Sequence, residues 1–294
     1  MAKSNSTSLG LGGRNIRVAS AGHVAFAVTL ITLGILGLIT ANFAPTWQPV
    51  PKSLPARQTL AHLCNAISLF CGIGLLWRRT GLMAARLLLA YLLLWLLLLR
   101  LPLIFGSPTV DMWWASCQTA AMTAAAWVLY AWFQPDLHRR HFNFASDGNG
   151  IRIARVLYGL ALIPFGVAHF IYLHVTADLV PRWLPSHVAW AYFTGCTFIA
   201  AGVAIVIGVY ARLAAVLATV QMGLFTVLIW LPVVTYGANS HQRAEFIVSC
   251  ALTGAGWVIA DSYNGLPWPA PRKGRTQLCQ NMAMDNLRTP HRNS

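Results

Sequence analysis

The stretch that decides the fold covers residues 160–234 and reads LALIPFGVAHFIYLHVTADLVPRWLPSHVAWAYFTGCTFIAAGVAIVIGVYARLAAVLATVQMGLFTVLIWLPVV. Three apolar runs are separated by one longer polar loop and one very short basic link. Each run is close to the ~20 residues that a helix needs to cross about 30 Å of hydrocarbon. The pattern therefore predicts consecutive membrane-spanning helices.

The composition of the whole chain agrees with this interpretation. Of 294 residues, 57% are hydrophobic and only 10% are charged, whereas soluble domains carry about 25% charged residues. A soluble fold could not hide so much apolar surface, so we expect the lipid bilayer as the main partner. The net charge of +14 is typical of nucleic-acid binding too, but the Lys and Arg residues sit at the ends of apolar runs and in the tails. That placement follows the positive-inside rule, and no nucleic-acid partner is expected.

Eight apolar runs are expected to form transmembrane helices, because only structures that pair their own backbone groups are stable in lipid. They cover residues 23–43, 60–77, 82–104, 112–133, 155–173, 187–209, 213–234 and 244–260. With the N-terminus inside, sixteen of the 21 Lys and Arg residues fall on the cytoplasmic side. This asymmetry predicts a multi-pass protein of the cell (inner) membrane with both termini in the cytoplasm.

The sequence also predicts an internal duplication. Residues 51–130 and 181–260, compared without gaps, share 17 identities in 80 positions. A Pro-x-x-Leu-Pro motif occurs in both segments, at 51–55 and at 181–185. A Leu-Pro pair also occurs in both, as Leu101-Pro102 and Leu231-Pro232. Each Leu-Pro pair is expected to end or kink its helix. Four spans per unit make both units point the same way, as a parallel repeat.

The duplication divides the chain into two four-helix bundles with tails and a linker. The expected boundaries are 1–21 for a cytoplasmic tail, 22–133 for the first unit, 134–151 for a cytoplasmic linker, 152–262 for the second unit and 263–294 for a basic tail. Close helix packing is expected at glycines seven residues apart, which share a helical face. These are Gly159 with Gly166, and Gly195 with Gly202.

Residues 152–262 resemble the DoxX family of integral membrane proteins. The stretches that carry the resemblance are GLALIPFGVAHFIY (159–172), VPRWLP (180–185), WAYFTG (190–195), AAGVAIVIGVYARLAA (200–215) and GWVIADS (256–262). The resemblance implies a four-helix membrane unit. It also implies a role of the kind described for some relatives, as subunits beside thiosulfate:quinone oxidoreduction or as membrane partners in thiol-stress systems.

A set of polar and ionisable residues falls in the second unit, toward the side that the charge count makes external. It comprises His169, Tyr172, His174, His187 and Glu245. Ionisable groups within spans are costly in lipid and commonly mark functional sites. At an offset of 130, positions 39, 44, 57 and 115 of the first unit carry no His and no Glu. The set therefore predicts an outward-open pocket that would hold a quinone head group or another small polar ligand.

Structural interpretations of the same residues stay open. Glu245 begins the last expected helix, where the positive end of the helix dipole favours a carboxylate. A lone histidine within a helix, such as His169, is commonly a hydrogen-bonded interior residue. Three polar residues in the spans of the first unit are expected to make interhelical hydrogen bonds: His62, Asn65 and Gln118.

The function is left as ranked hypotheses. No metal site is expected, because His169 and His174 are five residues apart and do not share a helical face. We expect no catalytic residues, since no glycine-rich phosphate loop, nucleophile–base pair or haem signature occurs. The first hypothesis is a non-catalytic membrane component of envelope or redox homeostasis, with a redox or envelope protein as its partner. The alternative is a quinone- or small-molecule-binding subunit of an oxidoreductase, and a small-molecule transporter is third.

Overall fold

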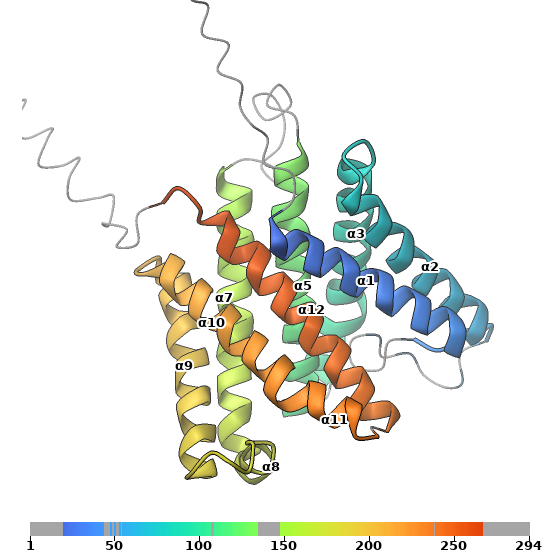
Figure 1. The fold of residues 1–294 in the computed structure, drawn as a ribbon. Coiled ribbons are helices and arrows are strands. Elements are labelled where there is room, and N and C mark those ends of the chain that lie inside the picture. The colour runs from blue at the N-terminus through green and yellow to red at the C-terminus, as the bar shows by residue number, and fades with distance from the viewer. Residues whose placement is uncertain are drawn as a thin grey trace, which may run out of the picture.

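The computed structural model describes residues 20–43, 48, 50, 53, 55–106, 109–134, 148–237 and 239–266, which are helical with no strand among them (Figure 1). The long helices of the first half are α1 (Ala21–Thr40), α2 (Arg57–Leu76), α3 (Gly81–Leu94) and α5 (Val110–Phe133). Those of the second half are α7 (Gly148–Ile171), α9 (His187–Ile207), α10 (Ala211–Phe225) and α12 (Ser240–Ser262). Shorter elements are α4 (Leu101–Gly106), α8 (Leu173–Asp178), α11 (Leu231–Thr235) and the π-helical segments η1 (Trp95–Arg100) and η2 (Thr226–Trp230).

Seven helices of the described chain are long and apolar enough to cross a membrane. The two runs from α3 to α4 and from α10 to α11 each count as one of them, covering Gly81–Gly106 and Ala211–Thr235. The multispanning helical character expected from the sequence is thereby confirmed in this coarser form. Helix α5, which covers the expected span 112–133, is not among the seven.

Helix α5 falls short in hydropathy because protein, not lipid, surrounds it. It carries Asp111 and Gln118 together with a series of Ala, Ser and Thr residues, and nearly all of residues 116–131 are buried. A helix that packs on other helices at all sides does not need bulky apolar side chains, and small residues let its neighbours approach closely. The low hydropathy of α5 thus follows from its central position.

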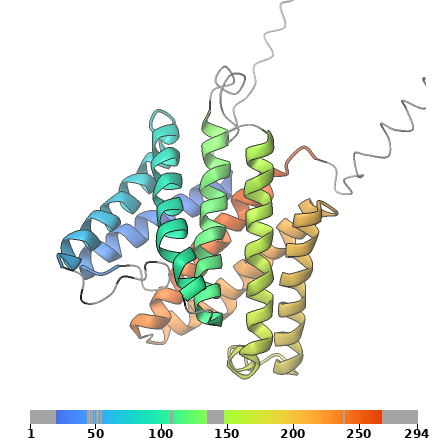
Figure 2. The same ribbon diagram turned by 180° about the vertical axis from the view of Figure 1, so that it is seen from behind.

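The eight long helices form a ring in which each contacts the next along the chain, and α12 returns to contact α1. Helices α5 and α12 also contact each other across the middle of this ring. Figures 1 and 2 show α5 and α7 side by side, with α12 crossing behind or in front of them according to the view. Two lobes result, one on each side of the α5–α12 pair. The expectation of two separate four-helix bundles is therefore wrong. The fourth helix of each half packs on the first helix of the other half: α5 on α7, and α12 on α1.

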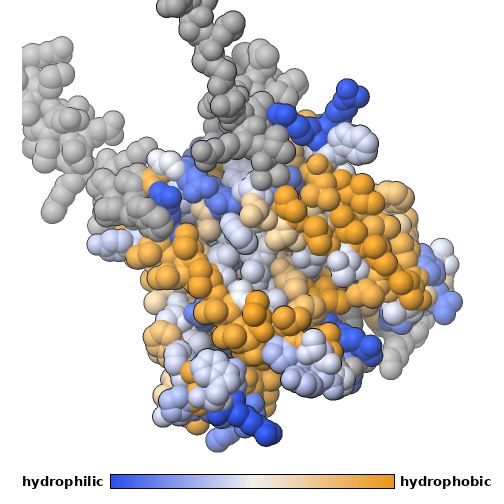
Figure 3. Space-filling view, viewed as in Figure 1, coloured by the Kyte–Doolittle hydropathy of each residue, from blue (hydrophilic) through white to orange (hydrophobic). Residues whose placement is uncertain are grey.

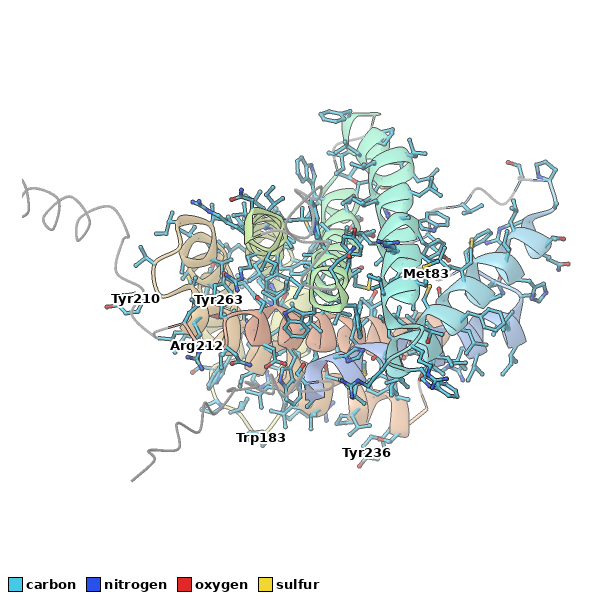
Figure 4. The ribbon with its side chains drawn as sticks, turned by 90° about the horizontal axis from the view of Figure 1, so that it is seen from above. Met83, Trp183, Tyr210, Arg212, Tyr236 and Tyr263 are labelled. Carbon is cyan, nitrogen blue, oxygen red and sulfur yellow. The ribbon has the colours of Figure 1, made fainter. Side chains whose placement is uncertain are left out.

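The surface agrees with a membrane setting. In Figure 3, hydrophobic residues cover the middle of the visible face, and hydrophilic residues gather toward its upper and lower rims. Trp183 and Tyr236 lie at the edge of the bundle and are 71% and 91% exposed (Figure 4). Tyr210, Arg212 and Tyr263 lie together in Figure 4, where α10 begins and α12 ends. Arg212 fastens this corner by donating to the carbonyl oxygen of Leu266 at 2.7 Å.

The expected glycine contacts are confirmed at the interface of α7 and α9. A Cβ atom on Gly202 would lie only 2.6 Å from the carbonyl oxygen of Gly159, and one on Gly195 would lie 3.0 Å from that of Gly166. The two backbones therefore touch, which only glycine permits at these positions. Helices α1 and α2 approach in the same manner at Gly72, where a Cβ would lie 2.8 Å from the carbonyl oxygen of Ala27.

The backbones of the two halves share several uncommon features at an offset of 130 residues. Ala56 and Ser186, which precede α2 and α9, both adopt left-handed conformations with φ of 55° and 56°. Thr109 and Asn239 both cap the following helix with their side chains. The Leu-Pro pairs do not end the helix, because the chain passes through a π-helical segment and continues as a short α-helix, and the expected kink stays a prediction. Proline cannot donate to the carbonyl four residues earlier, and a wider turn accommodates its ring.

The first helices of the two halves match with a different offset. Gly34 of α1 lies against the carbonyl oxygen of Asn65, and Gly166 of α7 lies against that of Gly195. Asn65 and Gly195 are 130 residues apart, whereas Gly34 and Gly166 are 132 residues apart. The position equivalent to His169 is consequently 37 and not 39. A constant offset failed here because the connection between the first two helices is two residues longer in the first half.

Candidate binding site

A cavity of about 100 Å³ lies inside the lobe of the second half, and we call it the inner cavity. Its wall comes from α5, α7, α8, α9, α10, η2 and α12, so the first half supplies one side through α5. Most of the lining is aromatic or aliphatic. The polar and aromatic residues used below are Trp114, Gln118, His169, Phe225 and Glu245.

His169 is a buried polar residue of the inner cavity. Its side chain is only 6% exposed, and Nδ1 lies 2.7 Å from the carbonyl oxygen of Phe165 one turn earlier. A carbonyl only accepts, so Nδ1 carries the hydrogen, and Nε2 of the neutral ring keeps its lone pair. The imidazole also stacks on Trp114 at an interplanar angle of 11° and on Phe225 at 25°. The ring is therefore fixed in one tautomer and one orientation.

Gln118 enters the inner cavity from α5. It is 2% exposed, and its Oε1 has no hydrogen-bond partner among the residues that the structure describes. A buried acceptor without a partner costs about 1–3 kcal/mol. The sequence analysis expected Gln118 to make an interhelical hydrogen bond, and for this oxygen that expectation is wrong. The side chain instead lines the inner cavity, with Oε1 itself covered by its neighbours.

Glu245 brings a carboxylate to the same cavity from the second turn of α12. The helix begins five residues earlier, so the carboxylate lies beyond the first turn, to which the effect of the helix dipole is confined. Helix α12 begins with a full capping box, in which the Asn239 side chain accepts from the Gln242 backbone and the Gln242 side chain accepts from the Asn239 backbone. This cap fixes the start of the helix and with it the position of Glu245.

Tyr172 lies just after α7 and faces α5 rather than the inner cavity. Its hydroxyl donates to Oδ1 of Asp111 at 2.8 Å. The hydrogen bond to Asp111 raises the pKa of Tyr172 above its ordinary value, and burial and the negative charge of the carboxylate act in the same direction. Tyr172 thus ties α5 to the end of α7 at the same end of the bundle as His169. This hydrogen bond joins the two halves beside the cavity.

The remaining members of the expected set do not join it. His174 is exposed on the short helix α8, and His187 is the first residue of α9. Neither lines the inner cavity. Within the described residues, no group of three or more His, Cys, Asp and Glu side chains could hold a metal ion. The structure therefore brings together His169 and Glu245 of the predicted set, with Tyr172 adjacent.

A wider apolar groove of about 540 Å³ lies between α9 and α10, and we call it the outer groove. Ala200 and Ala204 of α9 and Leu217 and Leu224 of α10 are part of its wall. Its main polar feature is Gln221, whose amide is already bonded. The outer groove and the inner cavity are neighbours, since four residues line both spaces: Thr176, Leu179, Phe225 and Ile229.

A corresponding space in the first half is nearly filled. It measures about 10 Å³ and is lined by residues of α1, α2, α3 and α5, among them Asn65 and Tyr91. Gln48 donates to the Tyr91 hydroxyl, and Nδ2 of Asn65 donates to the carbonyl oxygen of Asn42 at 2.9 Å. These four groups pair with one another, although Nε1 of Trp95, which lines the same space, has no partner among the described residues.

Sequence reasoning missed Trp114 and the role of Gln118. Both belong to α5 in the first half, while the other polar residues of the site belong to the second half. Their one available signal was that Gln118 is a polar residue in an otherwise uncharged span, and membrane-embedded polar groups commonly serve a site. Which lobe Gln118 faces depends on how the eight helices pack in their ring, and the hydrophobic periodicity of α5 does not predict it.

Comparison with known proteins finds a match for only part of the chain. A family model described as a domain of unknown function, DUF8561, matches residues 158–245. This segment contains all five residues of the predicted set and ends at Glu245, but it does not include α5. No curated protein and no solved structure matches the chain.

Proposed function

We propose that this protein is a multispanning membrane protein that binds a small lipophilic molecule by its polar head in the inner cavity. One observation carries the proposal. Inside an apolar bundle, the side chains of His169, Glu245 and Gln118 line one cavity, they come from three helices of both halves, and Oε1 of Gln118 is buried without a partner among the described residues. Buried polar groups without partners are costly, and a fold that retains one beside an open space is suited to a ligand that pairs with it.

The architecture that belongs to this proposal has eight spans, both termini in the cytoplasm, and the cell (inner) membrane as its location. Three facts support it. The described chain begins and ends on the same side of the bundle (Figure 1), as an even number of crossings requires. Helix α5 has 24 residues, enough to span about 30 Å of hydrocarbon. Sixteen of 21 Lys and Arg residues fall on the proposed cytoplasmic side.

A tandem duplication of a DoxX-like unit is the second part of the proposal. The left-handed residues Ala56 and Ser186, the caps Thr109 and Asn239, and the paired π-helical segments recur at an offset of 130 or one residue from it. Conformations of this kind are uncommon, so their recurrence supports a common origin of the halves better than shared apolar composition does. The pseudo-symmetric ring of helix contacts is consistent with it.

The proposed ligand class is a quinone or a chemically similar ring with an apolar chain. Such a molecule diffuses in lipid and would reach the inner cavity through the outer groove. The aromatic stack of Trp114, His169 and Phe225 suits a planar head group. A protein with this site would act as a ligand-binding subunit beside a redox or envelope protein that carries out the chemistry.

The test is to purify the protein in nanodiscs made with native lipids and to identify bound molecules by mass spectrometry. We expect one lipophilic molecule per chain, released from the wild type and lost from Gln118→Leu. The matched control is Gln134→Leu, which changes a buried glutamine at the other end of α5, outside the cavity. Bulk lipid alone in the wild type would overturn the proposal and favour a non-catalytic component that holds a protein partner.

A further inference from the structure

The outer groove contains an amide whose hydrogen-bonding capacity is only half used. Gln221 lines the groove from α10. Its Nε2 donates to the carbonyl oxygen of Thr194 at 3.0 Å, and its Oε1 accepts from the hydroxyl of Thr197 at 2.6 Å. A carboxamide has two donor hydrogens and two acceptor lone pairs, so one of each remains without a partner among the described residues. The acyl chains of a bilayer can pair with neither, and unpaired polar groups are costly in lipid.

Helices α9 and α10 form one edge of the bundle, and they present a large side chain beside a small one (Figures 1 and 2). Gln221 bonds to Thr194 and Thr197 of α9, and the two helices run in opposite directions. Leu217, one turn before Gln221, is therefore level with Ala200, about one turn after Thr197. Both line the outer groove, and Leu217 is 57% exposed. At this level a leucine projects from α10 while α9 leaves a gap.

The first half shows that the gap is not a general feature of the fold. The position equivalent to Ala200 is occupied by Phe70, a large side chain that is 67% exposed. The position equivalent to Gln221 is occupied by Tyr91, which is buried and accepts a hydrogen bond from Gln48 of its own half. The second half instead leaves both a space and an amide that can bond to another molecule.

We infer that the outer groove is the contact surface of a homodimer, in which a second copy of this chain is related by a twofold axis that runs along the membrane normal through the groove. Such an axis places Leu217 of each copy over Ala200 of the other. It also brings the two Gln221 amides together, and each donates its remaining N–H to the remaining lone pair of the other. A twofold contact requires a surface that is complementary to itself. Small residues and polar side chains are typical of contacts between membrane helices.

This inference goes beyond the proposed function and does not depend on it. A second copy seated in the outer groove would close the route by which a lipophilic molecule reaches the inner cavity. A ligand would therefore exchange with the monomer and be retained in the dimer. Dimers can form in a protein that binds no ligand, and a monomer can bind one, so the two proposals fail separately.

The first measurement is the oligomeric state of the full-length protein as it is diluted in lipid. Labelled protein is reconstituted into phosphatidylcholine vesicles at decreasing protein-to-lipid ratios, and dimers are counted by single-molecule photobleaching. We expect the wild type to pass from dimers to monomers over this series. Ala200→Phe should move the midpoint toward monomers by about tenfold or more, because the ring fills the space that receives Leu217. The fold accommodates this residue, since Phe70 occupies the equivalent position.

Three further variants complete the series. Val203→Phe is the matched control for Ala200→Phe, because Val203 is exposed on the same helix and does not line the groove, and it should leave the midpoint unchanged. Gln221→Leu removes the reciprocal amide pair and should move the midpoint roughly tenfold toward monomers. Thr197→Val removes a bond within the chain and keeps the amide, so its midpoint should stay at the wild-type value. An unchanged midpoint in Gln221→Leu would overturn the amide pair.

A photo-cross-linker identifies the contacting surface. With p-benzoyl-L-phenylalanine in place of Leu217, irradiation should give a covalent homodimer. In place of Leu87, the equivalent residue of the first half, which is 49% exposed, it should give none. Wild-type protein that stays monomeric at the highest protein-to-lipid ratio would overturn the inference and leave lipid as the occupant of the groove. Dimers that cross-link at position 87 and not at 217, or that persist unchanged in Ala200→Phe, would overturn it as well, because the contact would then lie elsewhere.

Discussion

The two halves of this protein have similar backbones and fill the same space in different ways. In the first half, Gly37 of α1 lies against the side chain of Asn65 of α2, so the second helix supplies the polar group. In the second half, His169 of α7 lies against Gly195 of α9, so the first helix supplies it. The large residue and the glycine have exchanged helices. Close packing is thus preserved while the chemistry of the space changes.

This exchange decides which half has room for a ligand. In the first half Asn65 pairs with Asn42 and Gln48 with Tyr91, only Nε1 of Trp95 is left without a partner among the described residues, and about 10 Å³ remains. The second-half imidazole bonds to its own helix, and about 100 Å³ remains. Satisfied polar groups rigidify a core, whereas an unpaired one beside a void leaves binding energy for another molecule. The comparison teaches that one half of the fold is suited to stability and the other to binding.

The largest expected effect concerns what the halves share. Gly166→Ala and Gly34→Ala should each lower the free energy of unfolding by about 2–3 kcal/mol, because the added methyl group would meet the backbone of the facing helix. Gly223→Ala is the control, since a Cβ there would meet only a methyl group at 3.5 Å. It should be neutral or stabilising by up to about 1 kcal/mol. Thermal unfolding in one detergent measures all three, and equal Tm values would mean that the helix pairs do not depend on close approach.

The second prediction separates the halves. In ligand-free protein, Gln118→Leu should raise the free energy of unfolding by about 1 kcal/mol, because it removes a buried acceptor that has no partner. Asn65→Leu should lower it by about 2 kcal/mol, because it leaves the carbonyl oxygen of Asn42 unpaired. Chemical denaturation of both variants gives the two values. A loss of stability in both would remove the proposed difference between a satisfied and an unsatisfied cavity.

Several parts of this fold were readable from the sequence for physical reasons. Lipid as a solvent demands long apolar helices, and touching helices demand small residues, so the runs and the glycines Gly159 and Gly202 were found. The central place of α5 was not readable, because hydropathy measures contact with lipid and α5 is covered by protein. The register of His169 was missed by two residues, since a gapless comparison cannot see that two connections differ in length.

The candidate site was only partly readable for a related reason. His169 and Glu245 were found because ionisable groups are rare in apolar spans. His174 and His187 are close to His169 in the sequence but do not line the inner cavity, and nothing in their spacing predicts this. Gln118 completes the site from the other half, through a contact between helices that are far apart in sequence.

A smaller effect is expected at the contact between the halves, where Tyr172 donates to Asp111. The hydrogen bond raises the pKa of Tyr172 above its ordinary value of about 10, so the folded state favours the neutral phenol. The stabilisation is therefore fully present below about pH 10 and is lost as the pH rises through the raised pKa. Tm measured from pH 8 to pH 11 should fall more for the wild type than for Tyr172→Phe. Parallel curves for the two proteins would show that the contact does not contribute.

The smallest expected effect lies at the two left-handed residues that begin α2 and α9. Ala56 and Ser186 hold φ near +55°, a conformation that costs an L-residue roughly 1–2 kcal/mol and costs glycine little. Glycine also loses more chain entropy on folding, by about 0.5–1 kcal/mol, which offsets part of this gain. Ala56→Gly and Ser186→Gly should each stabilise the protein by about 0.5 kcal/mol, seen as a rise in Tm of about 1–2 °C. Ala200→Gly, in an ordinary helical position of α9, should lower Tm instead. A gain at only one of the two sites would mean that the halves, despite the shared backbone angle, differ in how they begin their second helix.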